Sequence, residues 1–167
     1  MKLFDTLFRG HTTMKNISPE QMLGKIFERM VYDSLRDSPI LKVSTPNLAN
    51  PYSHYDIETN VCYIELKARS TLLTDFPNHI FLKQKYDSLS ILNMPVFYVL
   101  GAFPIENLYG SDNIYWMHRI DSNRKYEVSI VNNQTNYRIP NTAFRPIKLK
   151  NLEQEILKEV ISKGGIL

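Results

Sequence analysis

The sequence predicts an α/β or α+β domain in which helices pack against a mixed β-sheet. Two patterns carry this prediction: an amphipathic helical segment near the N-terminus precedes a hairpin, and a second helical segment precedes an almost wholly apolar strand. Helices that alternate with buried strands are typical of layered α/β architectures. The chain has 167 residues, which predicts a single domain over residues 1–167.

The composition excludes several classes of protein. Hydrophobic residues make up 43% of the chain and charged residues 22%, so the chain can build a packed core and is not disordered as a whole. The single cysteine, Cys62, excludes a disulfide-stapled scaffold. The net charge of +3 permits a nucleic-acid partner without demanding one.

The location of the protein is predicted from what the sequence lacks. No apolar run approaches the roughly 18 residues that a membrane-spanning helix needs. Asp5 and Arg9 interrupt the N-terminal apolar stretch, unlike the core of a signal peptide. We therefore expect an intracellular, cytoplasmic protein with no membrane partner. Asn and Ile are frequent, which is typical of AT-rich coding sequences, viral ones included.

The first helix is predicted from residue 18 to about residue 36. Ser18 is a good N-cap, Pro19 suits the first helical position, and Gln21 completes a capping box. Apolar residues then recur on one face with a period of 3.6. They are Met22, Leu23, Ile26, Phe27, Met30, Val31 and Leu35. Similar spacing predicts a short packing helix within residues 1–17.

A strand and a hairpin are predicted next. Residues 40–44 favour a strand, and residues 45–51, rich in Pro and Asn, favour a loop. Residues 54–57 and 62–68 are the two arms of a predicted β-hairpin, with a two-residue turn at Thr59–Asn60.

The rest of the chain predicts one more helix, three strands and a final helix. The second helix is expected from residue 77 to about residue 92, and the apolar residues 96–100 predict a strand covered on both faces. Residues 114–120 and 126–131 favour further strands. The last helix is expected to start after Asn151 and to end before Gly164.

The predicted hairpin brings charged side chains to one face. Within residues 62–68 the even-numbered residues are apolar and predict a core-facing side, whereas Glu65 and Lys67 share the opposite side. The expected turn places Asp56 opposite Tyr63. Asp56 is then diagonal to Glu65, on the face that carries Lys67.

Two carboxylates at this spacing can bind one divalent cation. Mg²⁺ takes oxygen ligands and is often bound through one or two carboxylates. A bound cation polarises a phosphoryl oxygen, and a neighbouring lysine can orient or deprotonate the attacking water. Two alternatives stay open. An exposed ladder of charged residues has the same pattern, and a turn that slips by one residue would give Glu58 or His54 a ligand role.

Asp56, followed by Glu65-Leu66-Lys67, resembles the motif of the PD-(D/E)xK nuclease superfamily. In that family a helical glutamate precedes the motif, and Glu28 stands in this position. The pattern Gly-x-x-x-Glu-Arg, then Asp, then Glu-x-Lys-x-Arg is similar to that of archaeal-type Holliday-junction resolvases. Tyr55 stands where the motif's name has proline.

The resemblance implies a fold and a metal centre. The fold would be a restriction-endonuclease-like core over about residues 18–102, a mixed central sheet flanked by helices. A β-rich extension with a final helix would occupy about residues 103–167. The catalytic and metal-binding residues it implies share one site for Mg²⁺ or Mn²⁺. They are Asp56, Glu65 and the backbone carbonyl of Leu66 as ligands, Glu28 through water, and Lys67 to position and activate the attacking water.

Other residues are candidates for nucleic-acid contacts. The family often places a Lys or Gln near the scissile phosphate on the helix after the motif. The candidates here are Lys83, Gln84 and Lys85. Arg69 is either a phosphate contact or a plain charge at a strand end. Arg119 ends a stretch that interleaves aromatic and basic residues. Such a stretch suits base stacking, but it also suits an amphipathic strand with Tyr115 and Met117 in the core.

These observations predict a metal-dependent nuclease that hydrolyses phosphodiester bonds. DNA is favoured over RNA, and a structure-selective or junction-resolving endonuclease, as in DNA recombination, is favoured among the DNA enzymes. A homodimer is expected if two strands are cut. The alternatives are an RNA endonuclease on the same core and a non-catalytic nucleic-acid-binding or assembly protein that keeps the fold.

Overall fold

The computed structural model describes residues 17–45, 53–110 and 112–164. The packing helix expected within residues 1–17 lies outside this part except for its last residue, and so does most of the expected loop at 45–51. The helices and strands are, in order, α2 (Pro19–Leu35), β1 (Ile57–Glu58), β2 (Tyr63–Arg69), β3 (Asn78–Leu82), α3 (Lys83–Ser90), β4 (Val96–Ala102), β5 (Tyr115–Ile120), β6 (Glu127–Val131), β7 (Gln134–Pro140), β8 (Arg145–Ile147) and α4 (Leu152–Ser162).

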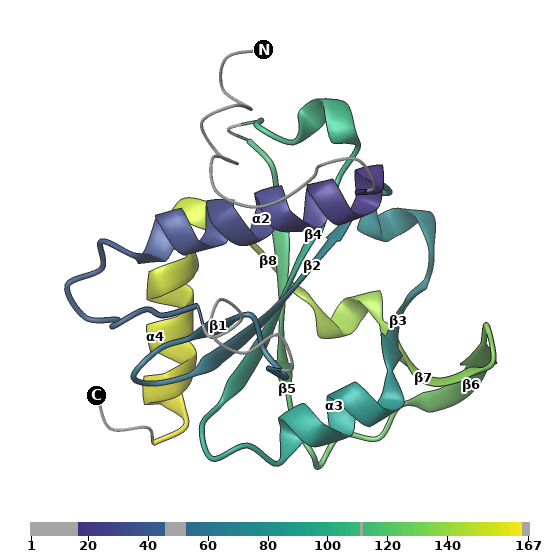
Figure 1. The fold of residues 1–167 in the computed structure, drawn as a ribbon. Coiled ribbons are helices and arrows are strands. Elements are labelled where there is room, and N and C mark those ends of the chain that lie inside the picture. The colour runs from purple at the N-terminus through teal and green to yellow at the C-terminus, as the bar shows by residue number, and fades with distance from the viewer. Residues whose placement is uncertain (1–16, 46–52, 111, 165–167) are drawn as a thin grey trace.

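Five strands form a mixed sheet in the order β1-β2-β4-β5-β8 (Figure 1). β2 runs parallel to β4, and the other neighbours in this sheet are antiparallel. A parallel pair needs a crossover connection between its strands, and β3 and α3 lie in that connection here. The α/β class with a mixed sheet is therefore confirmed.

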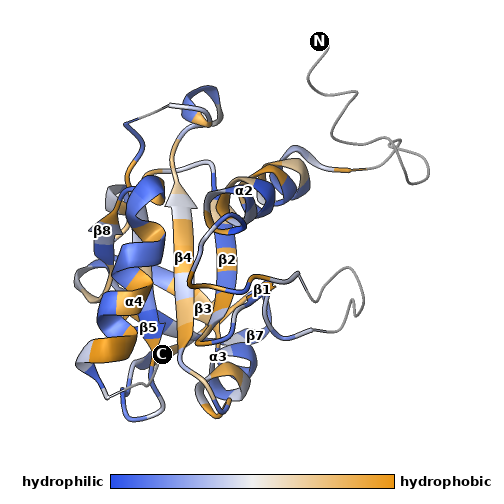
Figure 2. Cartoon of the chain, turned by 90° about the vertical axis from the view of Figure 1, so that its left-hand side faces the viewer, coloured by the Kyte–Doolittle hydropathy of each residue, from blue (hydrophilic) through white to orange (hydrophobic). Residues whose placement is uncertain are grey.

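Both faces of the five-stranded sheet are covered. On one face, Phe27 of α2 and Ile156 of α4 share a core with Phe97 of β4. On the other face lie α3 and a second sheet of three strands in the order β3-β7-β6, and Tyr86 of α3 shares a core with Tyr98 of β4. All seven residues of β4 are buried, as its apolar run predicts, and Figure 2 shows hydrophobic colours along most of this strand.

The first and last helices are confirmed. At the start of α2, Ser18 Oγ accepts a hydrogen bond from Gln21 N (3.3 Å), and Gln21 Oε1 accepts one from Ser18 N (3.0 Å). This is the predicted capping box. Asn151 precedes α4, although its side chain makes no capping hydrogen bond, and Gly164 follows the helix with a φ of 78°. Glycine adopts this left-handed conformation without strain.

The segment predicted as one helix from residue 77 to 92 is instead a strand and then a helix. β3 pairs antiparallel with β7, and its residues His79 and Phe81 are buried while their neighbours are half-buried. The helix, α3, begins only at Lys83 and has eight residues. Local periodicity could not reveal the strand, because the strand that pairs with β3 lies far along the chain.

The strand predicted at residues 40–44 is reduced to a single bridge between Ser44 and Glu58. A side chain replaces the missing strand partner, because Asn60 Oδ1 accepts a hydrogen bond from Lys42 N (2.9 Å). The prediction of a continuous strand is therefore wrong.

Residues 103–167, predicted as a β-rich extension with a final helix, contribute strands to both sheets. β5 and β8 complete the five-stranded sheet, and α4 covers one of its faces. The strand predicted at 126–131 is present as β6 but belongs to the second sheet. β7 and β8 were not expected from the sequence. Each half of the chain therefore supplies strands to both sheets.

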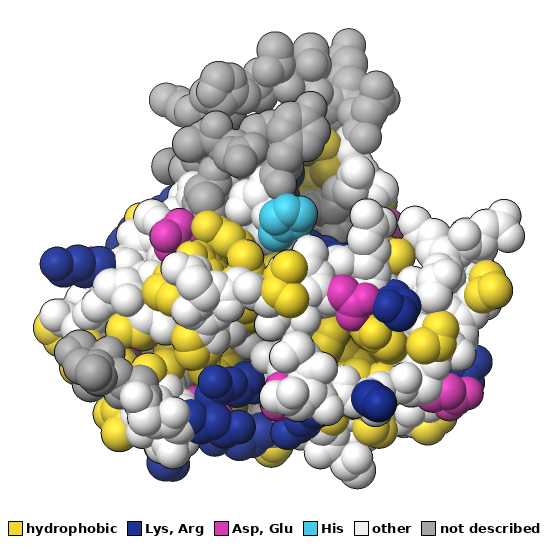
Figure 3. Space-filling model, turned by 90° about the horizontal axis from the view of Figure 1, so that it is seen from below, with side chains coloured by type: hydrophobic (Ala, Val, Ile, Leu, Met, Phe, Trp, Pro, Cys, Tyr) yellow, Lys and Arg dark blue, Asp and Glu magenta, His cyan; other side chains and the backbone are white. Residues whose placement is uncertain are grey.

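In the described part of the chain, no helix has the length and hydrophobicity that a transmembrane span requires. Figure 3 shows that several Lys and Arg side chains gather on one part of the face seen from below, while others on this face stand apart.

Candidate active site

The β1–β2 hairpin turns one residue later than predicted. Glu58 pairs with Tyr63 instead of Val61. Thr59 holds this turn, because its Oγ1 accepts a hydrogen bond from Cys62 N (2.9 Å). The two residues at the centre of the turn are therefore Asn60 and Val61, not Thr59 and Asn60.

The corrected register brings the two predicted metal ligands closer together. Continued by one pair beyond Ile57 and Ile64, it sets Asp56 opposite Glu65 instead of diagonal to it. Asp56 N donates to Ile64 O (3.0 Å), and Asp56 Oδ2 accepts a hydrogen bond from Leu66 N (2.7 Å). These two bonds hold the Asp56 carboxylate beside the strand that carries Glu65.

The later turn does not replace Asp56 by either of the alternative ligands. Asp56 keeps its place on the face of Glu65, and the alternatives His54 and Glu58 do not replace it. Glu58 Oε2 accepts a hydrogen bond from the Tyr55 hydroxyl (3.2 Å), and His54 is exposed.

Glu65 is a buried carboxyl group with two different oxygens. Its side chain is 8% exposed. Oε1 forms an ion pair with Lys85 Nζ, whereas Oε2 is buried and has no hydrogen-bond partner among the described residues. Burial raises the pKa of Glu65 to about 8, the nearby Asp56 carboxyl adds to this, and Lys85 opposes it. The site therefore favours a proton or a cation near Oε2.

Glu28 and Lys67 lie beside this pair and face one hollow of about 670 Å³. Glu28 lies near the middle of α2, and its pKa is raised by burial and then by Asp56. The pKa of Lys67 is lowered by partial burial and then by Arg69. Asp56 is thus within electrostatic range of Glu28, Glu65 and Lys67.

Of the three candidates on α3, only Lys85 reaches the site. Lys83 Nζ forms an ion pair with Asp87 (2.5 Å) and lies over the ring of Tyr137, and Gln84 is exposed and lines none of the hollows described here. Lys85 lines a hollow of about 460 Å³ together with Glu65 and other residues. The helix begins six residues later than predicted, which decides which of its side chains face the sheet.

The two arginine candidates lie on opposite faces of the five-stranded sheet. Arg69 ends β2 on the face of Glu65 and Lys67 and lines both hollows. Arg119 of β5 lines a different, small cavity with Lys163, at the end of α4, so it is not part of the candidate site. Tyr115 and Met117, on the same strand, are buried in the core as the amphipathic alternative predicts.

The donor atoms fit a hard divalent cation that keeps most of its water. Among residues 17–45, 53–110 and 112–164, no three His, Cys, Asp or Glu side chains come together closely enough to enclose a metal ion. Mg²⁺ does not require such an enclosure, because it is usually bound through one or two carboxylates and retained waters. Asp56 and Glu65 supply this pair, and the buried Oε2 of Glu65 is an oxygen that a cation would satisfy.

The β6–β7 hairpin adds residues that the sequence did not indicate. Asn132, Gln134 and Asn136 line the same hollow as Lys67 and Lys85. Asn132 and the following Asn133 have φ values of 51° and 60°, as a tight hairpin turn requires. The sequence signal that could have indicated this hairpin is the pair Asn132-Asn133, which lies between two short segments of alternating polar and apolar residues.

Comparison with models of protein families finds no match, and comparisons with curated proteins and with solved structures find no significant match either. The arrangement of the residues therefore carries the argument about function.

Proposed function

We propose that the protein is a divalent-metal-dependent nuclease with a PD-(D/E)xK-type, restriction-endonuclease-like core. The observation that carries this proposal is the placement of Asp56 beside Glu65 on one sheet face, with Lys67 next along the same face. The order of elements supports it: a helix, an antiparallel hairpin, a crossover that contains a helix, and a strand parallel to the second hairpin arm. The motif resemblance predicts this order.

Mg²⁺ or Mn²⁺ in this site would polarise the phosphoryl oxygen and acidify a water molecule. Asp56, Glu65 and the Leu66 carbonyl would hold the ion, with Glu28 acting through water. The hydrogen bond from Leu66 N fixes one Asp56 oxygen, which orients the carboxylate. Metal binding requires the ionised Glu65 carboxylate, and the raised pKa of Glu65 makes that binding depend on pH.

Lys67 is the residue that we assign to the attacking water. Its lowered pKa makes proton exchange with water at neutral pH easier than for an ordinary exposed lysine. Lys67 would orient the water and accept its proton. Arg69 and Lys85 would hold the phosphate, since both line the hollow around Lys67.

DNA is the proposed substrate ahead of RNA, with a structure-selective or junction-resolving activity, and this rests on the motif resemblance. A homodimer stays a prediction, which light scattering would check. One observation favours a non-catalytic nucleic-acid-binding protein instead: Lys85 already provides Glu65 with a cationic partner. Such a protein would bind in a salt-dependent way without cutting.

Cleavage with matched variants tests the proposal. Labelled single-stranded, duplex and four-way-junction DNA, and single-stranded RNA, are incubated with the protein in Mn²⁺ and in EDTA. We expect cutting only in Mn²⁺, a loss of about 10²- to 10⁴-fold in Lys67→Ala, and full activity in Lys158→Ala. Lys158 is an exposed lysine on α4, on the opposite face of the sheet. Absence of cutting by folded protein on every substrate would contradict the proposal.

A further inference from the structure

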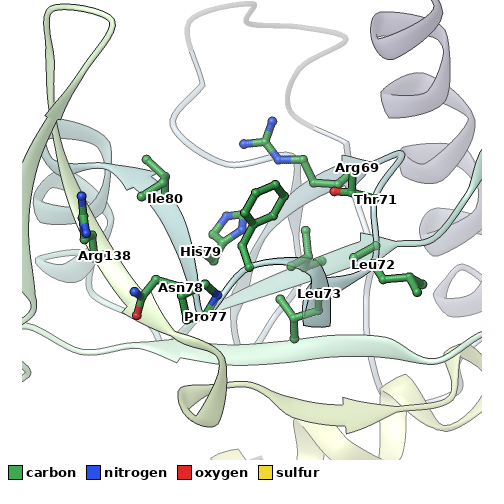
Figure 4. A pocket seen from close by; sticks show the side chains of 12 residues that line it. Arg69, Thr71, Leu72, Leu73, Pro77, Asn78, His79, Ile80 and Arg138 are labelled. Carbon is green, nitrogen blue, oxygen red and sulfur yellow. The ribbon is translucent and has the colours of Figure 1, made fainter.

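A second cavity, of about 400 Å³, opens beside the end of β2 (Figure 4). The turn after β2 lines one side, through Leu72 and Leu73, and the second sheet lines the other, through Ile80 of β3 and Arg138 of β7. The sequence showed no sign of this cavity, because the two strands of the second sheet that line it were not predicted.

The floor of the cavity is apolar and uncharged. Leu73, Leu100 and Ala102 are buried there. His79 is also buried, and its Nε2 lies 2.7 Å from the Tyr98 hydroxyl. Burial lowers the pKa of His79 to about 3, so this ring is neutral at physiological pH. The floor therefore suits a flat, uncharged ring system.

The rim, in contrast, carries positive charge. Figure 4 shows Arg69 and Arg138 on opposite sides of the cavity, and neither forms an ion pair with any residue that the structure describes. Phe76 and Leu72 are also at the rim and are 61% and 47% exposed. The Asn78 amide offers both a donor and an acceptor. An apolar slot between two guanidinium groups matches a nucleotide, which joins a planar base to an anionic phosphate.

The cavity adjoins the candidate active site. Arg69 and Ile80 line both this cavity and the hollow that contains Glu65, Lys67 and Lys85. Arg69 is two residues beyond Lys67 on the same face of β2, a separation of roughly 7 Å along the strand. A strand whose phosphate lies at Lys67 would therefore bring a neighbouring nucleotide to the cavity.

We propose that this cavity holds one unpaired base of the nucleic-acid strand next to the scissile phosphate. The proposal rests on the proposed nuclease function and adds a substrate class: strands with an unstacked base beside the cut. A base inside a duplex cannot enter the cavity without leaving its stack, so a base that is already unpaired binds at a lower cost. Phe76 would stack on the base, and Arg69 and Arg138 would contact the phosphates on either side.

Binding in EDTA tests this without cleavage. The probe is a DNA duplex with one unpaired 2-aminopurine, compared with the same duplex fully paired; the fluorescence of 2-aminopurine falls when it stacks. We expect tighter binding and quenching for the unpaired probe. Phe76→Ala should weaken its binding about tenfold, in line with the loss of one stacked base. Arg138→Gln should weaken it as well. Ile91→Ala is the matched control and should bind like the wild type, because Ile91 is a 79% exposed residue at the C-cap of α3 that lines neither hollow.

Three outcomes would overturn the proposal: equal affinity for the two probes, unchanged binding by a folded Phe76→Ala variant, or binding of free dAMP as tight as that of the unpaired probe. The last would indicate a pocket for a free nucleotide. The cleavage assay separates this inference from the proposed function. If the protein cuts in the presence of metal but shows no preference for unpaired bases, only the proposal about the cavity is refuted. If the wild type prefers the unpaired probe and Phe76→Ala abolishes this preference, but no substrate is cut, only the proposed nuclease function is refuted.

Discussion

Lys85 Nζ forms an ion pair with Oε1 of Glu65, and the other oxygen of the same carboxyl group stays buried without a hydrogen bond from the described residues. The ion pair with Lys85 favours the ionised form of Glu65, whereas burial and the nearby Asp56 carboxyl favour the protonated form. This asymmetry makes the protonation of Glu65, metal binding and the stability of the fold depend on one another.

Stability should fall as the pH rises from about 7 to 8. The pKa of Glu65 is about 8 in the folded protein and near its ordinary value of 4.5 when unfolded. In this window the folded state binds more protons at Glu65 than the unfolded state, so the free energy of unfolding decreases with rising pH and levels off above about pH 8. At lower pH the buried His79 and His118, whose pKa values are lowered, make the opposite contribution. Urea unfolding from about pH 7 to pH 9 measures the effect of Glu65. Glu65→Gln should remove this pH dependence, whereas Glu106→Gln, at an exposed position, should keep it. Parallel curves for wild type and Glu65→Gln would refute the assignment.

Mn²⁺ should stabilise the protein more at pH 8 than at pH 6. Metal binding requires the ionised carboxylate, and ionisation of Glu65 is more complete at the higher pH. At about 100 times the Kd, the stabilisation is about 2.7 kcal/mol, or a rise in Tm of roughly 5–10 °C. Differential scanning fluorimetry with and without EDTA would detect it. Asp56→Asn and Glu65→Ala should each abolish the rise. A rise that survives in both variants would mean that the ion binds elsewhere.

Lys85 and Lys83, two residues apart on α3, should differ sharply in their effect on cleavage. Lys85 faces Glu65 and the hollow around Lys67, whereas Lys83 is held by Asp87. We expect Lys85→Ala to lower the cleavage rate at least about tenfold, because it removes a charge that would contact the phosphate. Lys83→Ala should stay within about twofold of the wild type. Initial rates on the preferred substrate in Mn²⁺ decide this, and equal losses would place both lysines outside the site.

Two glycines should respond to alanine with opposite signs. A Cβ on Gly101 of β4 would lie 3.1 Å from Phe27 Cε2 and 3.2 Å from Phe103 Cε1, so Gly101→Ala should lower the free energy of unfolding by about 1–3 kcal/mol. A Cβ on Gly24, inside α2, would meet nothing within 4 Å. Gly24→Ala should therefore raise stability by about 0.5–1 kcal/mol through helix propensity. Thermal or urea unfolding measures both, and destabilisation by Gly24→Ala would show that the helix geometry is wrong.

Local patterns predicted the parts of the fold that depend on near neighbours. The capping box of α2, the core-facing residues of β2 and the buried run of β4 were all correct, because each is written in consecutive residues. The grouping of Asp56 with Glu65 was also predicted, although from a turn that was one residue off. It survived because moving the turn by one residue changes each cross-strand partner by two residues, which keeps each side chain on its face.

Elements that depend on distant partners were missed. β3 and β7 stabilise each other across the chain, and β7 contains too many polar residues to be recognised alone. The choice of Lys85 over Lys83 and Gln84 depends on where α3 begins, which the preceding strand sets. The separation of Arg119 from the site depends on which face of β5 meets α4. None of these is a property of a short segment.

The division of both sheets between the two halves of the chain limits how far the protein can be shortened. A fragment that ends at residue 102 contains every residue of the proposed metal site. It would nevertheless leave β4 as an open edge, because β5 pairs with it, and leave β3 without β7. The face that α4 covers would also be exposed to water. Such a fragment would be expected to associate through its bare strands before it bound any metal.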